Sequence, residues 1–245
     1  MRHVDRLPLP ARTSAYLAGR QLAVDKGGDA KPLWDGARQT RAFSPVTATL
    51  RKMAGATQRC VFCEDSLGAD VDHFWPVRGE PGYPERTFEW ENLLVVCTPC
   101  NRAKGTDFPL AGDGQPLLID PTADEPTGHL GFVPETGELA AVWEPGGEES
   151  KRGVETLRVI HNVISEPVND RRRAAYEVLE DAVQEYLDGD RNSTSLINTI
   201  RKHRDFGLAH WAFLGRGASR RPFADLQTSA PAVWLEAQEA ARATT

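Results

Sequence analysis

Two short motifs decide the fold of this chain, namely Cys60-Val61-Phe62-Cys63 and Cys97-Thr98-Pro99-Cys100. They contain all four cysteines of the 245-residue sequence, and 33 residues separate them. Four thiolates in two Cys-x-x-Cys pairs are the tetrahedral ligand set of a structural zinc ion. The spacing therefore predicts one zinc site on Cys60, Cys63, Cys97 and Cys100. A rubredoxin-like iron site and a thiol-redox pair are the alternatives.

The segment between and after the cysteine pairs carries residues suited to hydrolysis. Asp72 and His73 lie within it, and Asn101 directly follows the second pair. A histidine near its ordinary pKa of about 6.5 accepts a proton from water at neutral pH. Carboxylate and amide oxygens suit Mg²⁺ or Mn²⁺. Because neighbouring residues on a regular strand point to opposite sides, we expect a turn or short loop at Asp72-His73.

Three segments together resemble the HNH endonucleases, the ββα-metal nuclease family. They are Val71-Asp72-His73-Phe74-Trp75-Pro76, Trp90-Glu91-Asn92-Leu93 and Cys97-Thr98-Pro99-Cys100-Asn101-Arg102-Ala103-Lys104-Gly105. The resemblance covers about residues 58–108 and implies a zinc-stabilised ββα-metal core. Together with the mainly helical C-terminal part that apolar periodicity predicts, this gives an α+β fold.

The same resemblance assigns roles to individual residues. His73, Asn92 and Asn101 form the catalytic set, with His73 as the general base and Asn92 holding the histidine loop through backbone hydrogen bonds. Asp72 and Asn101 would hold a catalytic Mg²⁺ or Mn²⁺. Many family members have histidine at the position of Asn101, and an amide there favours these hard cations. Arg102 and Lys104, expected at the start of the following helix, would contact nucleic-acid phosphates.

Other interpretations of these residues remain open. Asp72 can be a turn residue and His73 a core histidine. The whole segment can also be a zinc module that binds nucleic acid or protein without cutting it. An RNA-cleaving toxin would use the same residues on another substrate. The expected substrate is DNA. RNA stays open as the alternative, because such a motif contacts phosphate and sugar rather than base edges.

Charge is distributed unevenly along the chain, whose formal net charge is −6. Residues 1–58 have a net charge of +6, residues 59–110 of −4, and residues 111–150 of −9. Weak DNA affinity of the chain alone is therefore expected. We predict five parts: a basic N-terminal arm (1–45), the nuclease core (46–110), an acidic connector (111–150), a helical region suited to partner docking (151–216) and a tail (217–245).

Local patterns predict the elements outside the core. Scattered proline and glycine in residues 1–45 favour an extended or loosely ordered arm. Ser44-Pro45 begins a predicted helix over 46–57. Short strands are predicted at 117–119, 131–133 and 139–143. Helices are predicted from 151 to before Pro167, from a cap at Asn169 or Asp170 to Gly189, and near 193–206, whereas the tail is weakly specified.

The downstream sequence is similar to a subgroup of long HNH proteins from bacterial anti-phage systems, the PtuB nucleases of Septu and the related retron-associated effectors. The shared segments are short, such as Leu118-Ile119-Asp120-Pro121 and Val154-Glu155-Thr156-Leu157. The resemblance implies a partner ATPase of the PtuA type. The sequence has neither an apolar run of about 20 residues nor an apolar signal region, so we expect a cytoplasmic protein.

Overall fold

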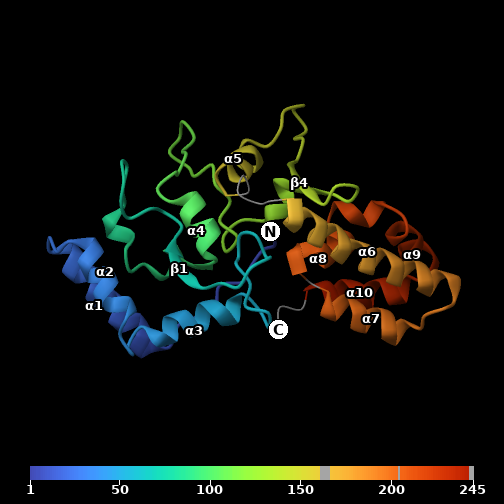
Figure 1. Ribbon diagram of the computed structural model, residues 1–245, viewed down its shortest axis with the longest axis horizontal. Helices are drawn as coiled ribbons and strands as arrows, with labels where there is room; N and C mark the ends of the chain where they lie inside the picture. The colour runs from blue at the N-terminus through green and yellow to red at the C-terminus, as the bar shows by residue number, and fades with distance from the viewer. Residues whose placement is uncertain (161–165, 204, 243–245) are drawn as a thin grey trace. The chain divides into compact units, whose positions relative to one another are not determined.

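The computed structural model of the protein describes residues 1–160, 166–203 and 205–242 (Figure 1). Its contacts divide the chain into two compact units. The cysteine unit comprises His3–Asp124 and Val159–Val163, and the helical unit comprises Met1–Arg2, Glu125–Arg158 and Ile164–Thr245. The described residues combine helices with two small antiparallel sheets, which confirms the predicted α+β class.

The centre of the cysteine unit is a ββα arrangement. Strand β1 (Asp70–His73) pairs antiparallel with β2 (Leu93–Val96), and helix α4 (Thr98–Lys104) follows β2 directly. All four residues of β2 are buried, as the uninterrupted apolar sequence Leu-Leu-Val-Val favours. The tight connection from β2 into α4 places the second cysteine pair at the end of a buried strand.

Helix α3 (Ser44–Met53) packs against β2 and covers it with one apolar face. Val46, Leu50 and Met53 are the buried residues of that face. They recur at the three- to four-residue spacing that aligns side chains along a helix. The helix predicted over 46–57 is thus present, although it begins two residues earlier and ends four residues sooner.

The N-terminal arm is helical, so the prediction of an extended or loosely ordered segment is wrong. Helix α1 (Ala11–Asp25) packs against α2 (Ala30–Arg38), and both are drawn in blue in Figure 1. Alanine and leucine give α1 good helix propensity, and the side chain of Asp29 caps α2 by accepting from the backbone N–H of Lys31. The prolines and glycines fall mainly between the helices or in their first turns, where they are tolerated.

Short turns complete the cysteine unit. The 3₁₀ turns η1 (Pro84–Arg86) and η2 (Trp90–Asn92) lie on the connection between β1 and β2. The strand predicted at 117–119 is absent from this described part of the chain, where Pro116 instead makes an isolated bridge with Leu110. Leu118 and Ile119 are completely buried there, because apolar residues can fill a core without joining a sheet.

The helical unit begins with a turn and a β-hairpin. Turn η3 (Pro126–Gly128) precedes strand β3 (Leu130–Val133), which pairs antiparallel with β4 (Glu138–Ala141). These strands lie at two of the three positions where strands were predicted. The remaining elements are α5 (Lys151–Val159), α6 (Glu166–Asp188), α7 (Ser193–Lys202), η5 (Asp205–Gly207), α8 (Leu208–Leu214), η6 (Arg216–Ser219), α9 (Phe223–Ser229) and α10 (Pro231–Arg242).

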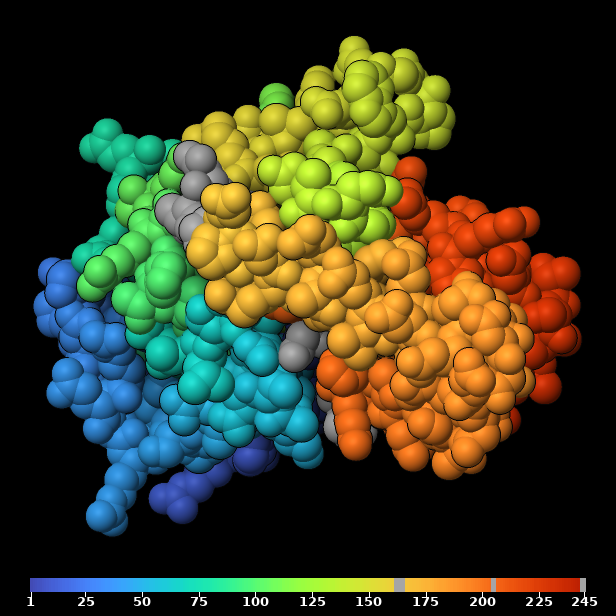
Figure 2. Space-filling model, turned by 45° about the vertical axis from the view of Figure 1, so that its right-hand side comes forward, coloured from blue at the N-terminus to red at the C-terminus, as the bar shows by residue number. Residues whose placement is uncertain are grey.

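An apolar cluster joins helices α6 to α10 and strand β3. It includes Leu179 of α6, Ile200 of α7, Phe213 of α8 and Trp234 of α10, all nearly or completely buried. Helices α6 and α7 lie side by side over it, in shades of orange in Figure 2. Burying large apolar side chains supplies the main favourable free energy of such a unit.

Two predictions for this region are wrong in their details. Helix α6 begins at Glu166, so Asn169 lies inside it, where its side chain accepts from the guanidinium of the buried Arg172. Arg172 also donates to the backbone oxygen of Gly137 at 2.7 Å. The segment 217–245, expected to be weakly specified, contains α9 and α10, because its tryptophan and alanines join the apolar cluster.

A search of the described helices finds none that combines the length and the apolar character required to cross a lipid bilayer.

Candidate functional site

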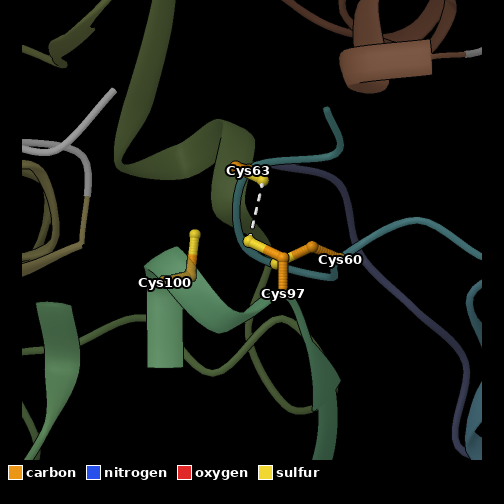
Figure 3. A group of neighbouring side chains, drawn as sticks. All are labelled: Cys60, Cys63, Cys97 and Cys100. Atoms are coloured by element: carbon orange, nitrogen blue, oxygen red, sulfur yellow. Dashed lines mark hydrogen bonds between the residues drawn. The ribbon is translucent and has the colours of Figure 1, made fainter. Parts of the chain in front are cut away.

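The four cysteines converge in the cysteine unit (Figure 3). Their sulfur atoms all lie within 4.8 Å of one another, and all four residues are buried. The Sγ atoms of Cys63 and Cys97 are 3.8 Å apart. Tetrahedral zinc with Zn–S bonds of about 2.3 Å places its sulfurs about 3.8 Å apart. The cluster can therefore hold a metal ion such as zinc.

Both cysteine pairs are fixed by the backbone around β2. The first pair lies in a loop whose Val61 N–H donates to the oxygen of Val95 at 3.2 Å, while Cys60 N–H donates to Ser66 at 2.8 Å. Cys97 precedes α4, and Cys100 is in the first turn of that helix. Hydrogen bonding with Cys60 raises the pKa of the Cys100 thiol, whereas hydrogen bonding from Cys100 lowers the pKa of Cys63.

His73 is the last residue of β1 and is only 7% exposed. Its Nε2 lies 2.9 Å from the backbone oxygen of Thr87. A carbonyl oxygen can only accept, so Nε2 carries the proton and Nδ1 of the neutral ring keeps its lone pair. Asp72 and His73 are both paired to β2 in a regular strand, without the turn that we predicted between them. Their side chains consequently leave the strand on opposite faces.

An aromatic side chain packs against the His73 ring. Trp34 of α2 packs against it, with ring centroids 4.3 Å apart, and Trp34 also contacts Phe88. Burial lowers the pKa of His73 to about 4, although the bond to Thr87 acts in the opposite direction. The imidazole is therefore neutral at neutral pH, as a proton acceptor must be, but it is a weaker base than the histidine near pKa 6.5 that the sequence predicted.

Asn92 connects three backbone groups on the β1–β2 connection. Its Oδ1 accepts from the N–H of Trp75 at 2.7 Å, and its Nδ2 donates to the oxygens of Trp75 and Arg86 at 3.1 and 3.0 Å. The side chain is buried, at 1% exposure. Such an arrangement fixes the segment that follows His73. The side chain of Asn92 is thus placed to hold the backbone after His73 in position, and it is too deeply buried to touch a substrate.

Asp72 faces a buried lysine from α4. The Nζ of Lys104 lies 3.3 Å from Oδ2 of Asp72 and donates to the backbone oxygen of His73 at 2.6 Å. Among the described residues, that buried Oδ2 atom accepts no hydrogen bond. Oδ2 is therefore paired with Lys104 by charge alone. A carboxylate oxygen is the ligand type that a hard cation prefers, so Asp72 fits the catalytic metal implied by the resemblance, with the Lys104 ammonium as its neighbour.

Lys104 does not fit the role predicted for it, because it is only 1% exposed. Helix α4 begins at Thr98 rather than after the cysteines, so Arg102 and Lys104 are in its last turn instead of at its start. Lys104 therefore points into the site, where it compensates the charge of Asp72. Arg102 is exposed and remains available for a phosphate contact.

Asn101 lies on α4 close to β1. Its Nδ2 donates to Oδ2 of Asp70 at 3.2 Å, which turns the amide oxygen away from that carboxylate. The structure thus joins Asn101 to Asp70 and Lys104 to Asp72 between α4 and β1, with His73 on the opposite face of the strand.

Several contributing residues were not identified from the sequence. Trp34, Thr87 and Asp70 contact the predicted residues from distant segments and belong to no motif. Arg6 is another, since its guanidinium donates to the backbone oxygens of Trp90 and Leu93 at 3.0 and 2.7 Å and so fixes the turn that carries Asn92. The net positive charge of residues 1–58 predicted a basic arm, but it did not indicate that Arg6 bonds to the backbone inside the cysteine unit.

Fold and site define a ββα unit with a four-cysteine cluster and a histidine, carboxylate and amide site, joined to a helical unit. No protein-family model matches the chain. Septu protein PtuB of Bacillus mycoides (strain KBAB4) is 28% identical to it over 171 residues, which cover 59% of this chain and 55% of that relative. Septu protein PtuB of Bacillus thuringiensis is 34% identical over 80 residues, which cover 31% of this chain and 28% of that relative.

The matched regions thus span about half of one relative and less than a third of the other. This similarity links the chain to the Septu PtuB proteins.

Proposed function

We propose that the chain is a metal-dependent endonuclease of the HNH type that hydrolyses phosphodiester bonds of DNA. The observation that carries the proposal is the neutral His73, whose Nε2–H is held by Thr87, next to Asp72, whose buried Oδ2 accepts no hydrogen bond among the described residues. Hydrolysis of a phosphodiester requires a proton acceptor and a cation ligand, and β1 carries both on successive residues, whose side chains leave the strand on opposite faces.

The chain's own residues would act as follows. Nδ1 of His73 takes a proton from a water molecule, whose oxygen attacks phosphorus. The bond from phosphorus to the leaving sugar oxygen breaks, and that oxygen takes a proton from solvent water. Asp72 and Asn101 would hold Mg²⁺ or Mn²⁺, which supplies charge stabilisation at the phosphoryl oxygens and the leaving oxygen. The four cysteines would hold zinc, which would fix the positions of β2 and α4 relative to the first cysteine pair.

We further propose that the chain works in a Septu-type anti-phage system beside an ATPase of the PtuA type. The similarity to the PtuB proteins supports this, and so does the amount of chain outside the cysteine unit. Residues 59–110 have a net charge of −4, so the isolated chain is expected to hold DNA weakly. A partner would then supply much of the nucleic-acid affinity, with the helical unit as its docking part.

Cleavage assays with zinc-loaded protein test the proposal. Plasmid DNA and total RNA are incubated with Mg²⁺, Mn²⁺ or chelator, using the chain alone and the chain co-purified with its ATPase. We expect nicking of DNA that requires Mg²⁺ or Mn²⁺, that is lost in Asp72→Asn and that persists in Asp113→Asn, which changes an exposed turn. Cleavage of RNA only would overturn the DNA assignment, and no cleavage under any condition would overturn the enzymatic one.

A further inference from the structure

Asp70 is a carboxylate beside the site that the proposed function does not use. It lies two residues before Asp72 on β1, opposite Val96 of β2. Residues two apart on a strand share one face of the sheet. Asp70 and Asp72 therefore both project toward α4, while His73 projects from the other face.

The side chain of Asn101 reaches the same face from α4. Asn101 and Lys104 are three residues apart on the helix, a spacing that places side chains next to each other. Lys104 Nζ lies 3.3 Å from Asp72, whereas Asn101 Nδ2 lies 3.2 Å from Asp70. The two aspartates thus each receive one donor from neighbouring positions on the helix.

The direction of the Asn101 amide decides whether it can bind a cation. Only the oxygen of an amide accepts, and its NH₂ group repels a cation. The bond from Nδ2 to Asp70 directs the nitrogen toward Asp70 and turns the amide oxygen away from that carboxylate. Without an acceptor at position 70, rotation of the side chain could bring either end of the amide toward Asp72.

We propose that Asp70 is a positioning residue that orients Asn101, so that its amide oxygen joins Asp72 in binding the divalent cation. The inference rests on the proposed function, because it concerns the same cation. Groups that orient a metal ligand by hydrogen bonding typically change metal affinity by about 10- to 100-fold when removed. Asp70 would therefore act on metal affinity without touching the substrate.

Titration of Mn²⁺ into zinc-loaded full-length protein, followed by calorimetry or by electron paramagnetic resonance, measures this affinity without any cleavage. We expect Asp70→Ala to weaken Mn²⁺ binding about tenfold. Asp70→Asn keeps an acceptor oxygen for Asn101 and should stay within about threefold of wild type. The control Asp113→Ala removes a carboxylate from an exposed turn and should leave the affinity unchanged. Zinc content and thermal melting establish that each variant is folded.

The results separate the inference from the function on which it rests. Wild-type binding that Asp72→Asn abolishes but Asp70→Ala leaves unchanged would overturn the role of Asp70 alone. A loss in Asp70→Asn as large as that in Asp70→Ala would also overturn it, because charge rather than orientation would then be responsible. Wild type without Mn²⁺ binding that depends on Asp72 would overturn both.

Discussion

Each of the two units of the chain is stabilised internally by a different kind of interaction. In the helical unit, apolar side chains from successive helices meet in one buried cluster. In the cysteine unit, an apolar strand and helix are supplemented by the four cysteines and by buried polar side chains that bond to distant backbone groups, as His73, Asn92 and Lys104 do. Apolar contacts tolerate small shifts, whereas hydrogen bonds fix directions. The unit that carries the candidate chemistry is therefore the one fixed by polar bonds.

The largest expected difference between the units is their response to loss of zinc. Structural zinc in small modules contributes about 10–16 kcal/mol of folding free energy. We expect Cys97→Ser to lose zinc and to unfold the cysteine unit, while the helical unit stays folded. Zinc analysis together with limited proteolysis, with fragments identified by mass spectrometry, measures both results. A zinc-free variant whose residues 60–105 resist protease as well as wild type does would contradict this account.

Removal of a core side chain from the helical unit should destabilise that unit and leave the cysteine unit and its zinc unchanged. Leu179 is completely buried in the helical unit. We expect Leu179→Ala to lower the free energy of unfolding of that unit by about 3–4 kcal/mol, without loss of zinc. The matched control is Val178→Ala on the exposed side of the same helix, which should change it by less than about 0.5 kcal/mol. If both variants lowered the free energy of unfolding equally, the claim that the apolar cluster stabilises the helical unit would be contradicted.

The buried ion pair gives a smaller effect in the cysteine unit. Lys104→Met keeps the size of the side chain but leaves Asp72 without its compensating charge. We expect a loss of about 3 kcal/mol for this unit, with partial recovery in the double variant Lys104→Met/Asp72→Asn. Arg102→Met on the exposed side of α4 is the control. Denaturant unfolding of zinc-loaded protein measures these effects, and a double variant less stable than Lys104→Met would rule out the compensation.

The smallest expected effect comes from Asn92. Asn92→Ala leaves the backbone groups of Trp75 and Arg86 without their partner, at a cost of about 2 kcal/mol. Asn198→Ala, which changes an exposed asparagine of the helical unit, is the control and should have little effect. The same unfolding measurement applies. If Asn92→Ala were as stable as wild type, the three hydrogen bonds of Asn92 would not hold the segment after His73.

The comparison also shows what could be predicted from the sequence. Periodic apolar residues predicted α3, α5 and α6, because a helix repeats its buried face along the chain. The cysteine spacing predicted the cluster, since metal ligands occur in recognisable pairs. The helicity of α1 was missed because few of its positions are buried and its apolar residues form no clear face, whereas α2 is short and its one-sided apolar pattern lies among glycines and a proline.

Contacts between distant segments could not be predicted. The burial of Lys104 and the packing of Trp34 on His73 depend on partners 31 or more residues away in sequence, for which no local pattern exists. The same holds for Asp70, whose bond to Asn101 joins β1 to α4. A motif identifies which residue types are present, but only the fold determines which atoms of those residues are free to react.

The most direct test of the difference between the units is the rate of Mn²⁺-dependent plasmid cleavage by two histidine variants with equal zinc content. His73→Ala removes the proposed base from the cysteine unit, and His203→Ala removes a histidine at the end of α7 in the helical unit. We expect the first to reduce the rate by about 100-fold or more and the second to leave it within about twofold of wild type. Equal rates for His73→Ala and wild type would contradict the assignment of the chemistry to this site.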